Sequence, residues 1–600
     1  MTVIGSKKNI LYYQIINPSF MKTKHLAIAG LALAALVACN KEKAVETPLQ
    51  DGDAYINVKI NYSDPASRGT AAEPPFYYGT AAEQKINNAY FVFYHADGSY
   101  DQYVKKEEKD LTFTSNGTDA STDNNVEELS DAVVVLRNLK IDNYPAFMSV
   151  ILNSNDDWIK TNISGKSISD AAEAVQTAIA TVGTDAQVGW TNFMMSSSSF
   201  NNGDESTGYY CTKLTTANFQ ETEEKAQEAG NPVEAYVERL AAKVKVDFGE
   251  SLNKEKGKIG SFVVDGQNKD LYYKVVGWGL DATTKDSYCF KNIDADWTKD
   301  GLGFEWNDPQ NFRSYWAKST NYGTGYYPTT YNSSDNPYYG KDGVTLNYIP
   351  YSGLKVQLGG HAYCRENTNN VQTIKNLPST ATTVLLGARI TDEKGDAITL
   401  YNYKVALYAE LDSYKAAALN DYEAKNPDKI IWKKTMENNE TKYTQVGTAD
   451  LDTVATADGF AHLELKDAEN YYYGAKATIN DNSTAVTTEE ANKLLNGTEP
   501  HKYDTECNFY RNGMMYYHIP IEHLRESDKT AAEYTMKDGD YGVVRNHYYI
   551  ITINSIKNLG KSVHDPDEEI VPNEDDSKNY YVAAKINVLS WKVVNQTVDL

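Results

Sequence analysis

Short runs of strand-forming residues constrain this chain more than any other feature of its sequence. Residues 89–94, 131–137 and 146–152 are rich in β-branched and aromatic side chains and are bounded by Asn, Asp and Gly. Such runs predict β-strands. Tyrosine occurs 46 times against 16 phenylalanines, and its amphipathic ring suits a pleated, half-buried surface. The chain is therefore predicted to be all-β, with a few short helices and long loops.

Helical patterns are few and are predicted at residues 169–180, 221–228 and 413–425. No apolar heptads persist and no period of 20 to 50 residues repeats, which argues against a coiled coil or a solenoid. Strands resume near residue 259, so we place a division at about residue 247 between a smaller first domain and a larger second one. Residues 294–351 form a loop-rich, aromatic insertion in the second domain, and long loops of this kind are usually functional or exposed.

Length and charge limit the class of protein. A chain of 600 residues with 41% hydrophobic and 23% charged residues predicts a globular protein of two to four domains of about 150 residues each. The formal net charge of −24 argues against a nucleic-acid partner, because a phosphate backbone requires a basic face. An acidic exterior fits a secreted surface protein.

Cysteine is scarce, and no CxxC pair occurs, which excludes a zinc ribbon and a thioredoxin-like motif. Beyond Cys39, two interpretations remain open for the thiols. They form two disulfides with one of three connectivities, or they are small buried hydrophobic groups. We favour the second, because a fold of this size does not need disulfides. The four residues are Cys211, Cys289, Cys364 and Cys507.

No pattern of catalytic or metal-binding residues is convincing. Residues 163–167 have the end of a phosphate-binding loop without its first glycine. Residues 518–523 hold two histidines and a glutamate, but a proline interrupts the helix that a zincin needs. Residues 294–301 are acidic but lack the closing glutamate of a calcium loop. Each is interpreted as an ordinary turn or surface cluster, so we predict no enzyme activity, no cofactor and no metal.

Residues 1–38 have the pattern of an export signal. Lys22 and Lys24 precede an unbroken apolar run at residues 26–38, which is shorter than the ~20 residues of a spanning helix and is typical of a secretory signal. Met21 fits the true start better than Met1. Residues 36–39 resemble a lipobox, which predicts that Cys39 is lipidated. The alternative is a buried core helix that happens to contain Cys39.

The segment after this signal alternates cleanly between apolar and polar residues. This pattern predicts a strand with one buried side, whose members are Ala54, Ile56, Val58, Ile60 and Tyr62. Residues 63–70 then form a loop of small and polar residues, where proteases cut most readily. Cleavage between Arg68 and Gly69 would release the strand together with its lipid anchor. The alternative is a plain first strand followed by a turn.

The C-terminal end has a similar alternation, interrupted near Leu589, after an acidic, proline-containing stretch at residues 564–577 that would let it swing. An extended tail could fill a groove that a removed strand leaves on a neighbouring copy. Head-to-tail contacts of this type need not close and can build filaments. The alternative is that the tail completes the sheet of its own domain. The predicted donor residues are Ile586, Val588, Trp591, Val593, Val594, Val598 and Leu600.

Several segments, in this order along the chain, resemble the fimbrillins, which are structural subunits of the type V pili of Bacteroidia. Within them the chain is most similar to the major structural subunit of the short (minor) fimbrium. The segments that carry the resemblance are the lipobox at Cys39 and residues 82–98, 237–246, 312–322, 363–368 and 542–549.

The resemblance implies a fold and a route of assembly. Two transthyretin-like β-sandwich domains are expected at residues 69–247 and 248–578, after a leader at residues 39–68 and before a donor-strand region at residues 579–600. Such proteins reach the outer membrane as palmitoylated lipoproteins, and an arginine-specific protease removes the leader and first strand. A different trypsin-like enzyme is the alternative. By position, Arg68–Gly69 is the matching bond.

The expected partners follow from this reading. They are further copies of the chain, the anchor and tip subunits of the pilus, the protease, host or bacterial surface ligands, and transiently the outer membrane. The expected role is a cell-surface pilus subunit that supports adhesion and biofilm formation. One alternative is a fimbrial anchor or accessory lipoprotein that is never cut. Another is a glycan-binding lipoprotein with an exposed aromatic platform of Phe312, Tyr315, Trp316 and Tyr322.

Overall fold

The structure is a computed structural model, and it describes most of the chain beyond the predicted signal. The described residues all lie in one unit, residues 49–600. They are residues 51–61, 79–112, 128–184, 187–198, 210–228, 232–293, 316–322, 346–376, 380–456, 459–468, 471–476, 478–480, 482–498, 503–523, 535–571 and 592–599.

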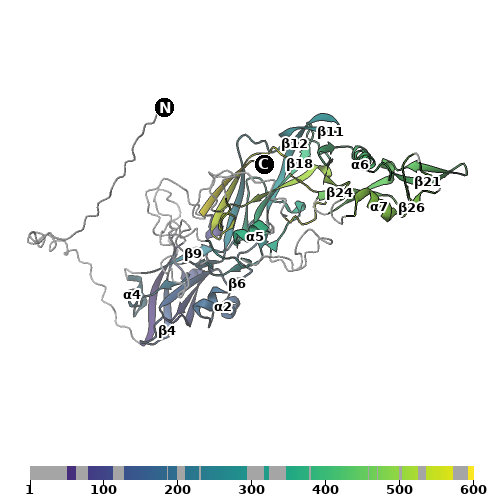
Figure 1. Ribbon diagram of the computed structural model, residues 1–600. Coiled ribbons are helices and arrows are strands. Elements are labelled where there is room, and N and C mark those ends of the chain that lie inside the picture. Colours follow the sequence, from purple (N-terminus) through teal and green to yellow (C-terminus); the bar gives the residue numbers. More distant parts are fainter. Residues whose placement is uncertain are drawn as a thin grey trace, which may run out of the picture. The chain divides into compact units, whose positions relative to one another are not determined.

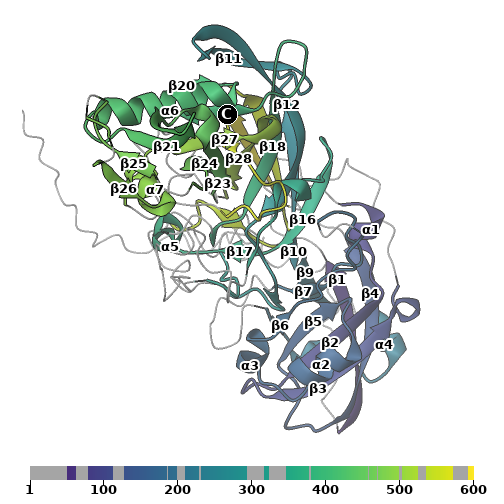
Figure 2. The same cartoon turned by 90° about the vertical axis from the view of Figure 1, so that its right-hand side faces the viewer.

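The first sheet has eight strands in the order β3-β2-β5-β7-β9-β1-β4, with β8 paired to β5 (Figure 2). Side chains from both halves of this sheet, including Ile56, Phe91, Val134 and Val150, are fully buried in one hydrophobic core. The strands are β1 (Gly52–Asn61), β2 (Asn88–Tyr94), β3 (Tyr100–Glu107), β4 (Glu128–Leu139), β5 (Phe147–Leu152), β7 (Met195–Ser197), β8 (Thr212–Lys213) and β9 (Val233–Arg239).

Short helices accompany this sheet: α1 (Ala81–Gln84), α2 (Asp156–Asn162), α3 (Ile168–Ala172) and α4 (Glu223–Glu228). The predicted helix at residues 169–180 is wrong beyond Ala172. The chain there turns into β6 (Val175–Gln176), which pairs with β14 (Ser287–Tyr288), and the amide of Cys289 donates to the carbonyl of Ala174 at 2.7 Å. Tertiary strand pairing therefore overrides the alanine-rich helix propensity.

A second sandwich is built from a four-stranded sheet in the order β16-β10-β30-β32 and a ten-stranded sheet. Val244 of β10, Ile551 of β30, Trp278 of β12 and Leu386 of β18 are fully buried in the core that joins them. The four strands are β10 (Ala241–Phe248), β16 (His361–Arg365), β30 (His547–Ser555) and β32 (Lys592–Asp599).

The ten-stranded sheet has the order β23-β24-β27-β19-β20-β11-β12-β18-β28-β31. Its paired strands β12 and β18 lie side by side in Figure 1. Its strands are β11 (Gly257–Val264), β12 (Gln267–Asp281), β18 (Thr383–Thr391), β19 (Leu400–Tyr403), β20 (Ala406–Tyr408), β23 (Leu451–Ala455), β24 (Phe460–Leu465), β27 (Cys507–Tyr510), β28 (Met514–Pro520) and β31 (Lys561–Ser562). Shorter elements nearby are β13 (Thr283–Thr284), β15 (Leu346–Asn347), β17 (Asn367–Thr368), α5 (Val371–Asn376) and β29 (Gly542–Val543).

Between β20 and β27 the chain adds a smaller packed region with its own core, in which Tyr414 and Leu495 are fully buried. It includes α6 (Leu411–Lys425), α7 (Thr488–Asn496) and a four-stranded sheet of β21 (Ile431–Glu437), β22 (Glu440–Gln445), β25 (Tyr471–Tyr473) and β26 (Thr484–Val486). Sequence reasoning found α6 and missed α7, although Thr487 and Glu490 form a capping box that the sequence displays.

The all-β prediction is confirmed, with few short helices. The strands expected at residues 89–94, 131–137 and 146–152 are β2, β4 and β5, and the helices at residues 221–228 and 413–425 are α4 and α6. Sheet membership changes at Leu240, between β9 and β10, so the predicted division at residue 247 falls inside β10.

The four described cysteines are free and buried, which confirms the preferred interpretation. Burial raises the pKa of the Cys364 thiol to about 12 and that of Cys507 to about 12. Burial also raises the pKa of Cys211 well above its usual value. A thiol with a raised pKa stays protonated and is a poor nucleophile at neutral pH. These residues therefore act as small hydrophobic groups of the core.

Buried charges join the first sheet to the second around the β9–β10 connection. The Lys243 ammonium lies 2.8 Å from the Glu83 carboxylate, and both side chains are 1% exposed. The Tyr363 hydroxyl also donates to Glu83 at 2.6 Å, and the Arg239 guanidinium donates to the Glu83 carbonyl at 2.9 Å. Two further buried pairs lie at the same junction, Lys291 with Glu238 and Arg545 with Glu366.

The pKa of Glu83 shows how this arrangement is balanced. Burial by itself would raise that pKa, but the nearby Lys243 charge and the hydrogen bonds from Lys243, Tyr363 and Thr80 together lower it below the usual value. Glu83 belongs to α1 and Lys243 belongs to β10, so the ion pair between them fixes α1 to β10. Stability from a depressed carboxyl pKa is present above the unfolded value and is lost as the pH falls through the folded one.

The first prediction concerns this buried pair. Lys243→Met leaves the Glu83 carboxylate buried without its cation, so we expect a loss of about 3–5 kcal/mol of unfolding free energy. Lys258→Met is the matched control, because Lys258 and Asp270 form an ion pair that is 49% and 42% exposed, and exposed pairs contribute about 0–1 kcal/mol. Urea unfolding of both variants measures the difference. Equal midpoints would contradict a structural role for the buried pair.

Candidate functional site

The first described strand, β1, lies inside the first sheet and not at its edge. It pairs along its length with β4 in antiparallel register, with Tyr55 opposite Val135 and Asn57 opposite Val133. On its other side, the stretch from Val58 to Asn61 pairs in parallel with β9. Nearer its start, Tyr55 exchanges two backbone hydrogen bonds with Gln220, at 2.8 and 2.9 Å. Both edges of β1 are therefore occupied.

The side chains of β1 alternate as the sequence predicts. Ala54 is 4% exposed, and Ile56 and Val58 are fully buried, while Tyr55 and Asn57 are half-buried. The backbone of Ile60 pairs with Ala235 of β9 and Ser130 of β4, and Tyr62 lies outside the described residues. The core under β1 thus has three described sites of fixed size, one small and two large.

Two carboxylates fix the start of β1 to the end of β4. Asp53 accepts from the amide of Asn138 at 3.2 Å and pairs with Arg137 at 3.0 Å. Asp51 accepts from the amide of Ile141 at 2.9 Å and pairs with Lys140 at 3.1 Å. The amide of Ile141 and the Lys140 ammonium lower the pKa of Asp51. These contacts fix the register of β1 from its first residues.

The position of β4 makes β1 structurally unusual. Among the described strands, β4 has β1 as its ladder partner and no other. Removing β1 would therefore leave β4 without a ladder partner among the described strands, held to β3 by the Gln102 side chain at Arg137. It would also expose two facing ladders, one on β4 and one on β9. Beneath them would lie the apolar core that Ala54, Ile56 and Val58 now cover. The result would be a groove in the place of β1, lined by the backbone edges of β4 and β9.

The region before the C-terminal tail is held in place. The amide of Ile570 donates to the carbonyl of Ile349 at 3.1 Å, and the amide of Ser352 donates to the carbonyl of Pro566 at 2.7 Å. Val563, Ile570 and Val571 are buried. The expected hinge at residues 564–577 is therefore wrong for its described part, because residues 564–571 are packed against residues 349–352. Residues 572–577 lie outside the described part.

The last strand, β32, pairs in parallel with β30 of the same chain, with Val593 opposite Tyr548 and Val598 opposite Ile553. In this structure residues 592–599 therefore complete a sheet of their own domain, as the alternative interpretation expected. Val593, Val594 and Val598 belong to this strand, and their role as donors stays a prediction. The predicted site residues outside the described part are Cys39, Arg68, Gly69, Ile586, Val588, Trp591 and Leu600.

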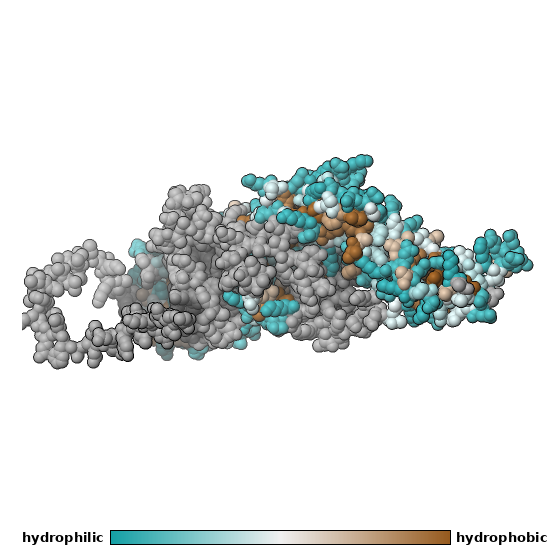
Figure 3. All heavy atoms as spheres, turned by 45° about the horizontal axis from the view of Figure 1, so that its top comes forward, coloured by the Kyte–Doolittle hydropathy of each residue, from teal (hydrophilic) through white to brown (hydrophobic). Residues whose placement is uncertain are grey.

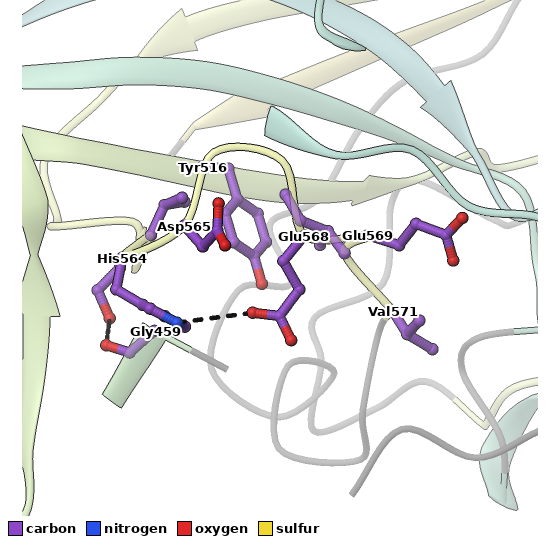
Figure 4. A pocket seen from close by; sticks show the side chains of 10 residues that line it. Gly459, Tyr516, His564, Asp565, Glu568, Glu569 and Val571 are labelled. Atoms are coloured by element: carbon purple, nitrogen blue, oxygen red, sulfur yellow. Dashed lines mark hydrogen bonds and ion pairs between the residues drawn. The ribbon is translucent and has the colours of Figure 1, made fainter. Parts of the chain in front are cut away.

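The described residues include a shallow pocket without catalytic character. It is lined by Tyr516, Gly459 and the segment of residues 562–571 (Figure 4). His564 pairs with Glu568 across it at 3.7 Å, and Asp565 and Glu569 lie nearby (Figure 4).

Within the described ranges no three His, Cys, Asp or Glu side chains are grouped so that they could hold a metal ion. The helices described here include none that is long and apolar enough to cross a membrane.

The other candidate motifs have structural roles. Residues 163–167 connect α2 to α3, and the Ser167 side chain caps α3. His518 lies on strand β28, which excludes the helix of a zincin, and its ring is 4.0 Å from the buried carboxylate of Asp281. Residues 294–301 lie outside the described part.

The aromatic platform proposed for glycan binding is wrong at Trp316. This side chain is fully buried and packs with Val544, 5.6 Å from the ring of His523 between centroids. Tyr322 is half-buried against the same cluster, and Phe312 and Tyr315 lie outside the described residues.

The face in Figure 3 is mixed, with hydrophobic patches among hydrophilic side chains. Large exposed apolar residues such as Val263 and Val276 lie on β11 and β12.

A family model matches the part of the chain that contains the tail. Residues 508–597, from β27 to β32, match the C-terminal region of fimbrillin, described as the major fimbrial subunit protein type IV. By that match, residues 508–597 of this chain are similar to the C-terminal region of the fimbrillin family. The resemblance read from the sequence is thus confirmed at the level of the family, and the assignment to the short fimbrium stays a prediction. No curated protein matches the chain.

Solved structures with some similarity include fimbrial and adhesion proteins. A putative cell adhesion protein from Parabacteroides distasonis is 10% identical, covering 91% of this chain and 99% of that one, with a TM-score of 0.31. A fimbrilin from Porphyromonas gingivalis is 12% identical, covering 91% and 97%, with a TM-score of 0.29. The C-terminally truncated tip fimbrial protein Mfa3 from Porphyromonas gingivalis is 10% identical, covering 66% and 99%, with a TM-score of 0.24.

The second prediction tests β1 as an integral strand of the uncleaved chain. Ile56→Ala removes a fully buried side chain, so we expect a loss of about 2–5 kcal/mol of unfolding free energy. Asn57→Ala, on the half-buried face of the same strand, should change stability by no more than about 0.5 kcal/mol. Urea unfolding of the uncleaved chain compares the two. A neutral Ile56→Ala would show that β1 does not belong to the core.

Proposed function

We propose that this chain is a structural subunit of a cell-surface pilus that polymerises by strand exchange after proteolysis. The observation that carries the proposal is the place of β1. It is the first described strand of the chain, yet it lies between β9 and β4 with its apolar face buried. A cut at Arg68 would free an internal strand that precedes the rest of the domain. The subunit would then need a replacement strand.

The leader supports export and a temporary anchor. The apolar run at residues 26–38 and Cys39 have the pattern of a lipoprotein signal, and the polar residues that follow would tether the chain to the outer membrane. Cleavage between Arg68 and Gly69, by an arginine-specific or another trypsin-like protease, would release the subunit from this anchor. The same cut would open the groove, so release and activation would be one step.

The tail supplies a strand of suitable direction. β1 runs parallel to β9, the last strand of the first sheet, and β32 runs parallel to β30 of the second sandwich. A tail that leaves β30 could enter the groove of a neighbour in the direction that β1 has. Such contacts are head-to-tail and do not close on themselves, so they extend into a filament. Main-chain ladders supply affinity in this mode of recognition.

The role is structural and supports adhesion and biofilm formation, with the anchor and tip subunits and surface ligands as further partners. An uncleaved anchor or accessory lipoprotein is the competing function, and an intact leader on the mature protein would favour it. A glycan-binding role is less well supported because Trp316 is buried.

The third prediction tests cleavage and the tail together. The chain expressed from Met21 and treated with a trypsin-like protease should give a ladder of polymers on unboiled gels. Arg68→Ala should block the ladder because β1 stays in place. Deleting residues 585–600 should block it because no donor strand remains.

Arg389→Ala is the matched control for Arg68→Ala. Arg389 is an exposed arginine on β18, outside the first sheet, so its loss should leave both cleavage at Arg68 and the ladder intact. N-terminal sequencing of the cleaved product checks that Gly69 is the new first residue. Polymers from both the Arg68→Ala and the deletion variant would rule out strand exchange.

A further inference from the structure

The tail contains a close copy of the strand that cleavage would remove. Ala54-Tyr55-Ile56-Asn57-Val58 and Ala584-Lys585-Ile586-Asn587-Val588 are identical at four of five positions, and the tripeptide Ile-Asn-Val occurs nowhere else in the chain. In β1 the three buried sites of this stretch are those of Ala54, Ile56 and Val58. The tail repeats the same three residue types at the same spacing.

The sizes of these sites select one register for the tail. A strand in the place of β1 must put residues i, i+2 and i+4 into the sites of Ala54, Ile56 and Val58. Within residues 579–600, four registers keep charged, amide, serine and threonine side chains out of all three sites. Their first residues are Tyr580, Val582, Ala584 and Leu589.

Three of the four registers fit the sites badly. Starting at Tyr580, a tyrosine would enter the site of Ala54 and an alanine the site of Val58. Starting at Val582, an alanine would enter the site of Ile56. Starting at Leu589, Trp591 would enter that site. Overpacking destabilises a close-packed core, and a large-to-small change at a buried isoleucine leaves a cavity that also destabilises it. The register from Ala584 has neither cost.

The strand β32 cannot make this fit. Its alternating positions place Asn595 or Gln596 among three consecutive inward sites, in whichever register it enters. An amide in a fully buried apolar site has no hydrogen-bond partner, and an unpaired buried polar group is unfavourable. The segment just before β32 is therefore the better occupant of the groove.

We propose that residues 582–590 of a second copy replace β1, with Ala584, Ile586 and Val588 in the sites of Ala54, Ile56 and Val58. This inference rests on the proposed function and adds its register and its specificity residues. Asn587 then occupies the place of Asn57, opposite Val133 of β4, and Lys585 that of Tyr55, opposite Val135. The groove would therefore recognise the tail through the same pattern of inward side chains that the removed strand has.

The register can be tested by cross-linking full-length chains. One chain carries Val133→Cys and a second carries Asn587→Cys; both are cleaved, mixed, polymerised and oxidised mildly. The proposed register puts these cysteines directly opposite each other, so a disulfide-linked dimer should appear on denaturing gels. The native described cysteines are buried, so they give little background.

Three partner variants report the competing registers at the same position of β4. Ala583→Cys, Lys585→Cys and Lys592→Cys would lie opposite Val133→Cys if the tail entered from Tyr580, Val582 or Leu589. A slip of two residues moves a cysteine about 7 Å along the strand, which is beyond the reach of a disulfide. Cross-linking with Asn587→Cys and not with these three is the expected result.

Other results would overturn the inference in distinguishable ways. A ladder of polymers in which a competing variant cross-links, or in which none does, means that strand exchange occurs in a different register. Absence of polymers from the wild-type chain means that the proposed function itself is wrong. If Val133→Cys does not fold, Val135→Cys with Lys585→Cys tests the same register, with Tyr581→Cys as its mismatched control.

A side-chain test complements the cross-link. Ile586→Asp places a charge in the fully buried site of Ile56 and should abolish the polymer ladder. Lys585→Asp puts the same charge on the half-buried face of the strand, in the place of Tyr55, and should leave a ladder. Loss of the ladder in both, or in neither, would contradict the inward direction of Ile586.

Discussion

The first sheet depends on the two ladders of one strand. Among the described strands, β4 has its only backbone ladder with β1, and β1 reaches β9 only from Val58 onward, with Gln220 pairing nearer its start. Most sheets lose an edge when a strand is cut away, but this one would lose a connection in its middle. In the proposed function, a replacement strand restores that connection. The buried pair of Glu83 and Lys243 would then hold α1 to β10 while the place of β1 is open.

The second sandwich also has a strand between an antiparallel and a parallel partner, but a single cut could not remove that strand. β10 lies between an antiparallel partner, β16, and a parallel one, β30, just as β1 lies between β4 and β9. The chain before β10 is β9, separated from it by Leu240, so no cut can release β10 without breaking the first domain. The chain before β1 is the predicted leader. In the proposed function, proteolysis would therefore open only the first sheet, and the subunit would have one acceptor groove and one direction of growth.

Much of this arrangement could be predicted from the sequence, because period-two alternation and short aromatic runs are local signals. They located β2, β4 and β5 and the buried face of β1. The failures have tertiary causes. Residues beyond Ala172 leave the helix to pair with β14, residues 564–571 are held by carbonyls and amides of residues 349–352, and Trp316 is buried by Val544. The internal position of β1 could not be predicted either, because no local sequence pattern indicates which two strands flank a given strand.

A strand bonded on both edges has a mechanical consequence. Force applied along such a strand loads its hydrogen bonds to β4 and to β9 together, so it can leave only when both ladders shear at once. A strand at an edge can be peeled away one bond at a time. A subunit linked to its neighbour through the place of β1 would thus be suited to carry tension, and the proteolytic step that creates the site would also determine the tensile strength of the fibre.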